Sequence, residues 1–391
     1  MHIFKDSPEN EGIAPLLQTY APYPFPLVSG RGEQVFDADG KAYLDFYGGH
    51  CVAGTGHCHP QVANALAAQA RQLMFYSAAA RLPVRDEAAQ ALMAFAPAGL
   101  ASAFFCNSGA EANESALKVA VQLTGRHRFA AFKGSFHGRT LLALSVTDSP
   151  ELKQSLGPLV APVDFLPFGD PDALGAADFS KSAAVIVEPI PSMAGVSTTT
   201  SAWFAALKDK CERAGTLLIF DEVQTGMGRL GQPFAAQLYG VTPHMLTLAK
   251  SIASGVPMGA LLMSPAVASA LKSGDLGSTF GGGPLACAAL LATLKVIHEE
   301  KLMANASAQE QRIRAALAGS FIREVRGAGL LLGLKAGRHA AALKKYLQGQ
   351  RILVGGSSDA EVLRLMPPLN VSDAAVDSLL EAIKSFGASH P

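Results

Sequence analysis

Two apolar runs in the middle of the sequence each end in a charged residue. The first leads from Thr216 to Asp221, and the second ends at Lys250, which stands 29 positions after Asp221. Each run predicts a buried parallel strand. Because chemistry in an open α/β sheet takes place beyond the carboxyl ends of the strands, we expect the acid and the lysine to share one crevice. A lysine that forms a Schiff base and an aspartate that pairs with a pyridinium nitrogen are what a pyridoxal phosphate site needs.

A third segment has the composition of an anion-binding helix start, and it reads Asn107-Ser108-Gly109-Ala110-Glu111-Ala112-Asn113-Glu114. It directly follows an apolar run, so free backbone N–H groups and the helix dipole would meet a phosphate there. Small residues allow a close approach. The same residues also suit an ordinary helix N-cap, so this segment alone leaves phosphate binding open. The glycine loop 277–284 carries the hydroxyls of Ser278 and Thr279, which suit phosphate but are equally weak evidence alone.

The segment Phe136-His137-Gly138-Arg139-Thr140 follows another apolar run, which ends at Phe132. An aromatic ring at a strand exit can stack on a cofactor ring, and the neighbouring arginine can hold a carboxylate with two parallel hydrogen bonds. Taken by itself, the pentapeptide is equally compatible with a core phenylalanine and a solvated arginine.

Two further motifs do not predict a ligand site. The residues Gly226, Gly228 and Gly231 match a dinucleotide-binding pattern, but five residues separate the motif from the end of its strand, and no acid stands about twenty residues further on. The segment Gly56-His57-Cys58-His59-Pro60 resembles a metal site only in composition, because adjacent residues in a turn rarely converge on one ion. We interpret it as a structural turn.

Short apolar runs alternate with helical patterns from about residue 61, which predicts a mostly parallel, doubly wound α/β sheet. Asp39-Gly40 predicts a hairpin near the start. A long helical pattern from Leu285 to Glu300 leads to a smaller α+β unit, in which strands are expected at 328–334 and 362–368. We therefore expect an N-terminal segment (1–45) that forms part of the small domain, a large cofactor-binding domain (46–284) and a C-terminal small domain (285–391).

Composition excludes several classes of function. The 391 residues carry 32 basic and 32 acidic side chains, so nothing favours nucleic acid or an anionic membrane surface. Charged residues make up 16%, below the usual ~25%, and this suggests surface buried in an oligomer. The five cysteines are scattered, and no basic region precedes an apolar core at the N-terminus. We expect a cytoplasmic protein without a metal ion.

Together the segments resemble the class III aminotransferases of pyridoxal phosphate fold type I, most closely the acetylornithine and ornithine branch. The resemblance rests on NSGAEANE (107–114), FHGRT (136–140), VEP (187–189), IFDEVQTGMGR (219–229), LAK (248–250) and GSTFGG (277–282). RGEQVFDADGKAYLDF (31–46) and GHCHP (56–60) near the start also match, so the resemblance covers nearly the whole chain. The resemblance implies a large domain with a mostly parallel doubly wound sheet, a smaller α+β domain, and a homodimer with the active site at the interface.

It also implies a role for each matching residue. Lys250 would carry the cofactor and later move a proton as general base and acid, and Asp221 would pair with the pyridinium nitrogen. Contacts to the cofactor are implied for Ser108, Gly109, Ala110, Phe136, His137, Glu188, Gln224, Ser278 and, from the other subunit, Thr279. Arg139 would hold a substrate carboxylate, and Arg364 would lie at the far side of the pocket.

The chain departs from the family pattern at one informative place. Where related enzymes read EPIQGE, this chain has Glu188-Pro-Ile-Pro-Ser-Met193, so the second glutamate, which neutralises the arginine that matches Arg364, is replaced by Met193. An unpaired buried cation is costly, so we expect the substrate to bring an acceptor or another acid to pair with Arg364. His50 stands where relatives place a specificity residue, and either a substrate contact or a structural role fits it.

The resemblance implies transfer of an amino group from an amine or ω-amino acid, an acetylornithine- or ornithine-like donor, to an oxo acid such as 2-oxoglutarate. The same cofactor and fold also support an aminomutase, a racemase or a decarboxylase, which would not depend on an oxo acid. A scaffold without turnover is a third reading, and the intact set of Lys250, Asp221, Gln224 and Arg139 argues against it.

Overall fold

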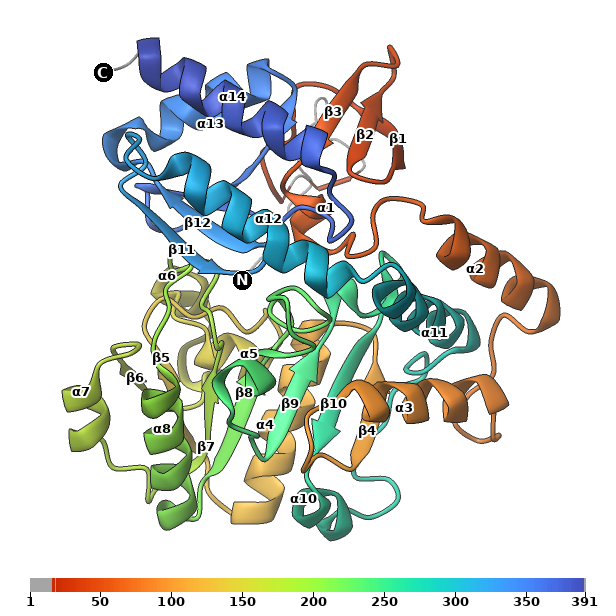
Figure 1. Cartoon of the computed structure of the whole chain (residues 1–391). Helices are drawn as coiled ribbons and strands as arrows, with labels where there is room; N and C mark the ends of the chain where they lie inside the picture. The colour runs from red at the N-terminus through yellow and green to blue at the C-terminus, as the bar shows by residue number, and fades with distance from the viewer. Residues whose placement is uncertain (1–15, 18, 390–391) are drawn as a thin grey trace, which may run out of the picture.

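A seven-stranded sheet forms the centre of the computed structural model, which describes residues 16–17 and 19–389 (Figure 1). The strand order is β4-β10-β9-β8-β7-β5-β6. Neighbours from β9 to β6 are parallel, and β10 runs antiparallel to both β9 and β4. The strands are β4 (Ser102–Cys106), β5 (Arg128–Phe132), β6 (Val163–Leu166), β7 (Ser182–Val187), β8 (Leu217–Asp221), β9 (Met245–Leu248) and β10 (Gly259–Met263). The predicted doubly wound, mostly parallel sheet is confirmed.

The sheet buries side chains on both faces, which explains why its strands are continuous apolar runs. Ala184 and Ile186 of β7 pack in the cluster that includes α4 (Gly109–Thr124), while Val185 and Val187 pack in the cluster that includes α8 (Ser201–Ala214). The edge strand β6 was not predicted, because its four residues are at most half-buried and include the exposed Asp164.

The remaining helices surround the sheet and its loops. They are α2 (Pro60–Gln72), α3 (Pro83–Phe95), α5 (Leu141–Val146), α6 (Pro150–Lys153), α7 (Pro171–Ala176), α9 (Ala235–Tyr239), α10 (Pro265–Ala270) and α11 (Pro284–Glu299), with 3₁₀ turns η1 (Gln154–Leu159) and η2 (Lys250–Ala253). The long helix predicted from Leu285 to Glu300 is α11, which packs on α2 and α3.

A second, antiparallel sheet has the order β11-β12-β15-β14 and is accompanied by three helices. Its elements are α12 (Leu302–Leu317), β11 (Glu324–Ala328), β12 (Leu331–Lys335), η3 (Gly337–His339), α13 (Ala340–Gly349), β14 (Gly355–Gly356), β15 (Val362–Leu365) and α14 (Asp373–Ser389). The strand expected at 328–334 is confirmed as β12, but it begins only at Leu331, because a turn at Gly329 (φ 53°) separates it from β11. The expected strand 362–368 ends at Leu365, before two prolines that cannot donate to a ladder.

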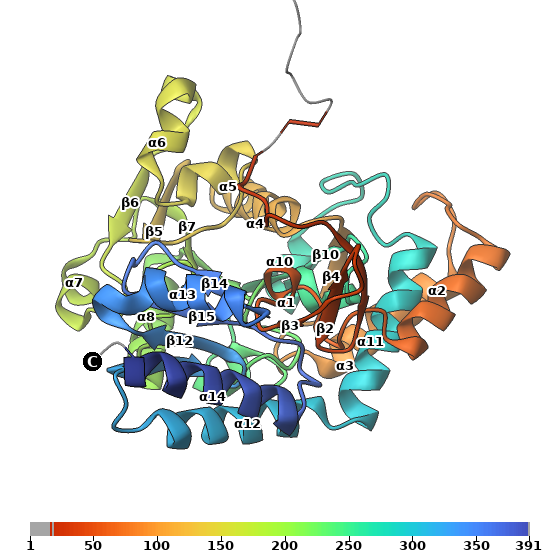
Figure 2. The same cartoon turned by 90° about the horizontal axis from the view of Figure 1, so that it is seen from above.

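The N-terminal hairpin joins the C-terminal part of the chain. Strands β1 (Leu27–Arg31), β2 (Gln34–Asp37) and β3 (Ala42–Asp45) form a sheet with β13 (Ile352–Leu353), which lies parallel to β3. The predicted turn at Asp39-Gly40 is confirmed, and Gly40 has φ 77°. Seen from above, the hairpin lies beside β14 and β15 (Figure 2). The division into domains at 45 and 285 stays a prediction, and residues 1–15 of its first segment lie outside the described residues.

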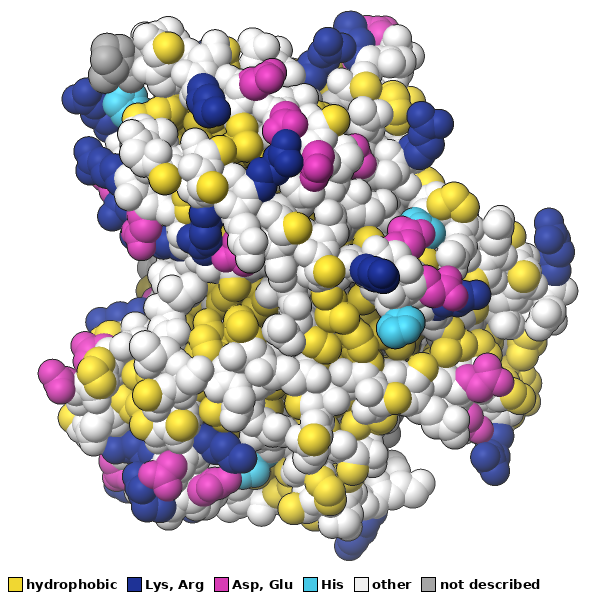
Figure 3. Space-filling view, viewed as in Figure 1, with side chains coloured by type: hydrophobic (Ala, Val, Ile, Leu, Met, Phe, Trp, Pro, Cys, Tyr) yellow, Lys and Arg dark blue, Asp and Glu magenta, His cyan; other side chains and the backbone are white. Residues whose placement is uncertain are grey.

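Charged side chains of both signs are interspersed over the face shown in Figure 3, in keeping with the net charge of +0. A band of hydrophobic side chains crosses the middle of this face, between the helices of the second sheet and strands β8–β10. No helix in the described part of the chain is long and apolar enough to cross a membrane.

Glu222, directly after β8, is a buried acid that fixes the loop between β8 and α9. Its carboxylate accepts the backbone N–H groups of Ala235 (2.6 Å) and Ala236 (2.8 Å) and the hydroxyl of Thr225 (3.0 Å). These bonds hold the start of α9. Burial nevertheless dominates and raises the pKa of Glu222 to about 7, while the three donors partly offset it.

This shift predicts a measurable pH dependence of stability. The folded state favours protonated Glu222, so its contribution is fully present below the ordinary pKa of 4.5 and is lost as the pH rises towards about 7. The loss amounts to at most about 3 kcal/mol. In Glu222→Gln, the free energy of unfolding should fall less between pH 4.5 and 7.5, as measured by denaturant unfolding. The surface variant Glu212→Gln should keep the wild-type slope, and an unchanged slope in Glu222→Gln would contradict the assignment.

Candidate active site

A cavity of about 430 Å³ lies beyond the carboxyl ends of the parallel strands. It brings together ten of the residues selected from the sequence, namely Ser108, Gly109, Ala110, Phe136, His137, Arg139, Glu188, Asp221, Gln224 and Lys250. They come from loops after five strands, β4, β5, β7, β8 and β9. The expected crevice shared by Asp221 and Lys250 is therefore present.

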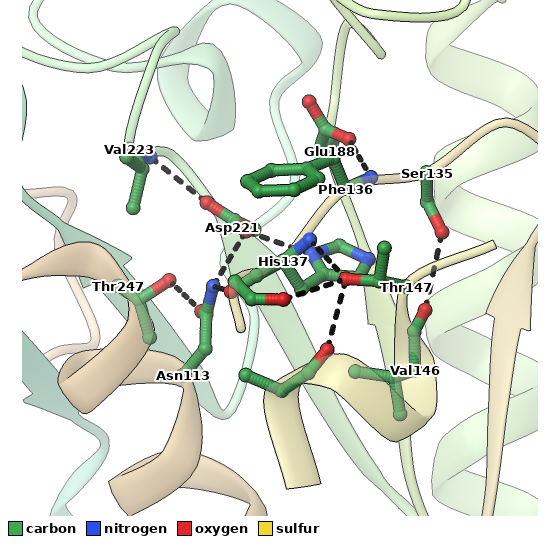
Figure 4. A network of polar contacts seen from close by, with 12 residues as sticks. Asn113, Ser135, Phe136, His137, Val146, Thr147, Glu188, Asp221, Val223 and Thr247 are labelled. Atoms are coloured by element: carbon green, nitrogen blue, oxygen red, sulfur yellow. Dashed lines mark hydrogen bonds and ion pairs between the residues drawn. The ribbon is translucent and has the colours of Figure 1, made fainter. Parts of the chain in front are cut away.

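Asp221 is the centre of the polar network in this cavity (Figure 4). Its Oδ2 accepts hydrogen bonds from Nδ2 of Asn113 and Nδ1 of His137, both at 2.7 Å, and its Oδ1 accepts the N–H of Val223 at 3.1 Å. The side chain of His137 is fully buried, and Asp221 is 4% exposed. These donors hold the carboxylate in one orientation in a low-dielectric site.

Asn113 was missed as a site residue by the sequence reasoning. Its Nδ2 also donates to the carbonyl of His137 (2.8 Å), and its Oδ1 accepts the hydroxyl of Thr247 on β9 (2.6 Å). Asn113 thus connects α4 with strands β8 and β9. A signal was available, because Asn113 lies one turn after Gly109 on the same helix face and is a polar residue among alanines.

Lys250 stands at the start of η2 with φ 50°, a left-handed conformation that is rare for lysine. Burial lowers the pKa of Lys250, and the positive charge of Arg364 adds to this effect, while Cys51, Asp221 and Glu188 oppose it. A larger fraction of the amino group is therefore neutral near neutral pH than for an exposed lysine.

Glu188 follows β7 and lies on the same side of the network as Phe136 (Figure 4). Its Oε1 accepts the backbone N–H of Phe136 at 2.8 Å, which fixes the loop that carries this ring. Burial raises the pKa of Glu188 to about 7, with a smaller opposing effect from His137.

The start of α4 has the geometry of a capped helix. Oγ of Ser108 accepts the N–H of Glu111 (3.2 Å), and the Glu111 carboxylate accepts the N–H of Asn107 (2.5 Å). The N–H groups of the first helical residues keep no intrahelical partner. A Cβ on Gly109 would lie 2.9 Å from a methyl of Val223, so glycine lets this helix start approach the loop after Asp221.

Five predicted residues do not line the cavity, namely His50, Met193, Ser278, Thr279 and Arg364. Ser278 accepts a hydrogen bond from Nδ2 of Asn107 (3.1 Å), so its loop lies beside the start of α4, while Thr279 is exposed. Met193 is half-buried, and its carbonyl accepts two bonds from Ser358.

Arg364 on β15 is 3% exposed and has neutral partners. Its guanidinium donates to Oγ of Ser192 (2.8 Å) and to the carbonyl of Gly356. In the described part of the chain no carboxylate forms an ion pair with it. The alternative in which another acid pairs with Arg364 therefore has no support within the described chain.

The residues of the cavity fit pyridoxal phosphate. Among the described residues, Oε1 of Gln224 and Nε2 of His137 are buried polar atoms without a hydrogen-bond partner, so the amide oxygen can accept one further bond and the ring nitrogen can take part in one. Oδ1 of Asp221 accepts one bond only and has room for a ring N–H. A helix start with free N–H groups lies in the same cavity as the lysine.

Comparison with known proteins places these features in a family. The sequence pattern described as "Aminotransferase class-III" matches residues 18–386. The acetylornithine aminotransferase of Methanocaldococcus jannaschii is 40% identical over 94% of both chains, and that of Streptomyces coelicolor is 42% identical over 94% of this chain and 92% of the relative. Among solved structures, the ornithine aminotransferase of Toxoplasma gondii superposes with a TM-score of 0.89 at 30% identity, over 96% of this chain and 94% of that one.

Proposed function

Since this chain belongs to the class III aminotransferases, enzymes that depend on pyridoxal phosphate, we propose that it moves the amino group of an acetylornithine- or ornithine-like donor to 2-oxoglutarate. The single observation that carries the proposal is the convergence of Lys250, Asp221 and Gln224 on one cavity. A lysine, a fixed buried carboxylate and a glutamine amide that can donate to the ring oxygen match, in one site, the needs of this cofactor.

The cavity offers a partner for each part of the cofactor. Asp221, oriented by Asn113 and His137, would hold the ring nitrogen protonated. Gln224 would contact the ring oxygen, and Phe136 would stack on the ring. The phosphate would be held by Ser108, Gly109 and Ala110, with Ser278 nearby. When bound, pyridoxal phosphate supplies an electron sink for the carbon that loses its amino group.

Lys250 is proposed to anchor the cofactor and to move the reacting proton. Its Nζ would take the proton from the amine-bearing carbon of the donor and pass it to C4′ of the cofactor, so that the proton does not return to the donor carbon. The lowered pKa of Lys250 keeps the amino group able to accept that proton near neutral pH. Glu188 accepts a hydrogen bond from the backbone N–H of Phe136, so it fixes the loop that carries this ring into the cavity.

Two arginines are proposed to bind the carboxylates of the substrates. Arg139 is exposed and lines the cavity, where it can form a two-point contact with a carboxylate. Arg364 retains its charge beside the neutral Ser192, so a substrate with a second carboxylate would meet an uncompensated cation. With Met193 in place of a glutamate, we expect that no carboxylate of the described chain competes with the substrate for this cation.

The first test is a panel of amines added to the purified holoenzyme without an oxo acid. The visible absorbance of the bound cofactor should disappear with ornithine-like donors and return when 2-oxoglutarate is added.

In Met193→Glu, the added carboxylate should pair with Arg364 and shift the ratio of kcat/KM towards donors without a second carboxylate by about tenfold. Turnover that does not require any oxo acid would sink the proposal, and an unchanged ratio would exclude position 193 as a specificity determinant.

A second copy of the chain is proposed to cover an exposed apolar patch. The patch consists of Leu73, Met74, Phe75, Tyr76 and Phe280, and the rings of Phe75 and Phe280 lie 5.0 Å apart. Exposed apolar residues that cluster in this way mark protein interfaces. Thr279 lies within this surface, which would bring it to the cofactor of the other subunit.

Light scattering tests the dimer directly. Phe280→Asp places a charge in the apolar patch, so it should give monomers with a cofactor Kd raised at least about tenfold. Leu159→Asp is the matched control, because Leu159 and Phe280 are both 64% exposed, and it should stay dimeric. A dimeric Phe280→Asp protein with normal cofactor binding would contradict this interface.

A further inference from the structure

A turn of left-handed helix stands beside Lys250. The four residues Gly48, Gly49, His50 and Cys51 (α1, Gly48–Cys51) have φ values of 60°, 53°, 73° and 62°. The turn is closed by bonds from the N–H of Cys51 to the carbonyl of Tyr47 (2.9 Å) and from Val52 to Gly48 (2.8 Å). Glycine adopts this conformation readily, but His50 and Cys51 adopt it against the preference of L-residues, so surrounding contacts must hold them.

Asp45 supplies these contacts. It ends β3, is 4% exposed, and uses both carboxylate oxygens. Oδ1 accepts the N–H groups of Tyr47 (3.0 Å) and Gly48 (2.8 Å), and Oδ2 accepts those of Gly49 (2.9 Å) and of Nε2 of His57 (2.8 Å). Successive N–H groups in such a turn form a concave anion-binding site, and here the chain supplies its own anion.

His57 belongs to the segment Gly56–Pro60, which the sequence analysis interpreted as a structural turn. Its backbone exchanges two hydrogen bonds with Gly32 (2.8 and 3.0 Å), so its ring is fixed to the N-terminal hairpin. The ring therefore fixes Asp45, and Asp45 fixes the left-handed turn.

The turn is in direct contact with the active site. The carbonyl of Cys51 accepts the hydroxyl of Ser251, the residue after Lys250, at 3.0 Å, and Sγ of Cys51 lies 3.8 Å from the carbonyl of Gln224. Val52 lines the cavity. On its other side, a Cβ on Gly48 would lie 2.3 Å from the carbonyl of Met366, so the turn also abuts the strand that carries Arg364.

His50 lies close enough to Lys250 and Arg364 for both positive charges to affect its pKa. Burial lowers the pKa of His50 to about 4, and the charges of Lys250 and Arg364 add to the effect. His50 is therefore neutral at physiological pH, and its Nδ1 contacts the hydroxyl of Tyr47.

We propose that Asp45 is a positioning residue for the substrate side of the active site, because it holds the left-handed turn that places His50 and Cys51 between Lys250 and β15. The expected effect of Asp45 on substrate binding rests on the proposed function. The expected effect of Asp45 on the conformation of the turn can be measured without enzyme activity.

The test compares Asp45→Asn with Asp37→Asn in the holoenzyme. Asp37 is an equally buried carboxylate in the same sheet, and it accepts the N–H groups of Asp39 and Lys41 and the hydroxyl of Tyr43, far along the hairpin from Lys250. An amide at position 45 can accept at only one atom and turns a donor towards N–H groups. The turn should relax in Asp45→Asn only.

Two readouts separate positioning from general stability. The buried thiol of Cys51 should react with N-ethylmaleimide at least about tenfold faster in Asp45→Asn, by peptide mapping, with the exposed Cys58 as internal standard. The KM for the amino donor should rise about tenfold while kcat stays within about threefold and the cofactor absorbance is retained. In Asp37→Asn, both the reactivity and the KM should match the wild type.

The proposal is overturned if Cys51 stays protected in Asp45→Asn, or if the two variants change alike. If Asp45→Asn does not fold, Gly49→Ala takes its place as the test variant. Its side chain strains the same turn through the positive φ, and its Cβ fits without a clash, since the nearest atom, in His57, would lie 3.8 Å away. Gly40→Ala is the control for this variant. Failure of the wild type to convert any donor would refute the proposed function, while the reactivity of Cys51 would still test the turn.

Discussion

The cost of burying charge governs the arrangement of this protein. Asp221 lies inside a low-dielectric cavity and is kept there by three donors from α4 and from the loops after β5 and β8. Lys250 reaches the same cavity from β9 with a pKa lowered by burial. The burial of each charged group is tolerated because the strands bring its neighbours to one edge of the sheet. The parallel arrangement of β5, β7, β8 and β9 is therefore required by the chemistry as well as by the fold.

The features that were predictable from the sequence are those written in local patterns. Continuous apolar runs predicted β5, β8 and β9, because strands buried on both faces show no alternation. Asp221 and Lys250 followed from the ends of those runs. The break at Gly329 was not predictable, because it depends on the approach of the Arg229 carbonyl, which would lie 2.4 Å from a Cβ there. The position of Asn113 on the same helix face as Gly109 was a local signal, but the role of Asn113 depends on His137, Asp221 and Thr247, which are distant in sequence.

The substrate side of the cavity is where this chain differs from the family pattern. Arg364 has two neutral partners, Oγ of Ser192 and a backbone carbonyl. These dipoles stabilise its guanidinium where the family pattern has a glutamate carboxylate. The strained turn 48–51 faces the same region through Met366. Backbone strain at the turn 48–51 and the cation of Arg364 thus lie together on the side of the active site that we propose binds the substrate.

The proposed chemistry depends on Lys250 as the residue that carries pyridoxal phosphate. Borohydride reduction of the holoenzyme, followed by digestion and mass spectrometry, tests it most directly because reduction makes the link between lysine and cofactor permanent. We expect one modified peptide per chain, with the cofactor mass on Lys250. A cofactor fixed to another lysine, or a protein that binds the cofactor and is left unmodified at every lysine, would contradict it.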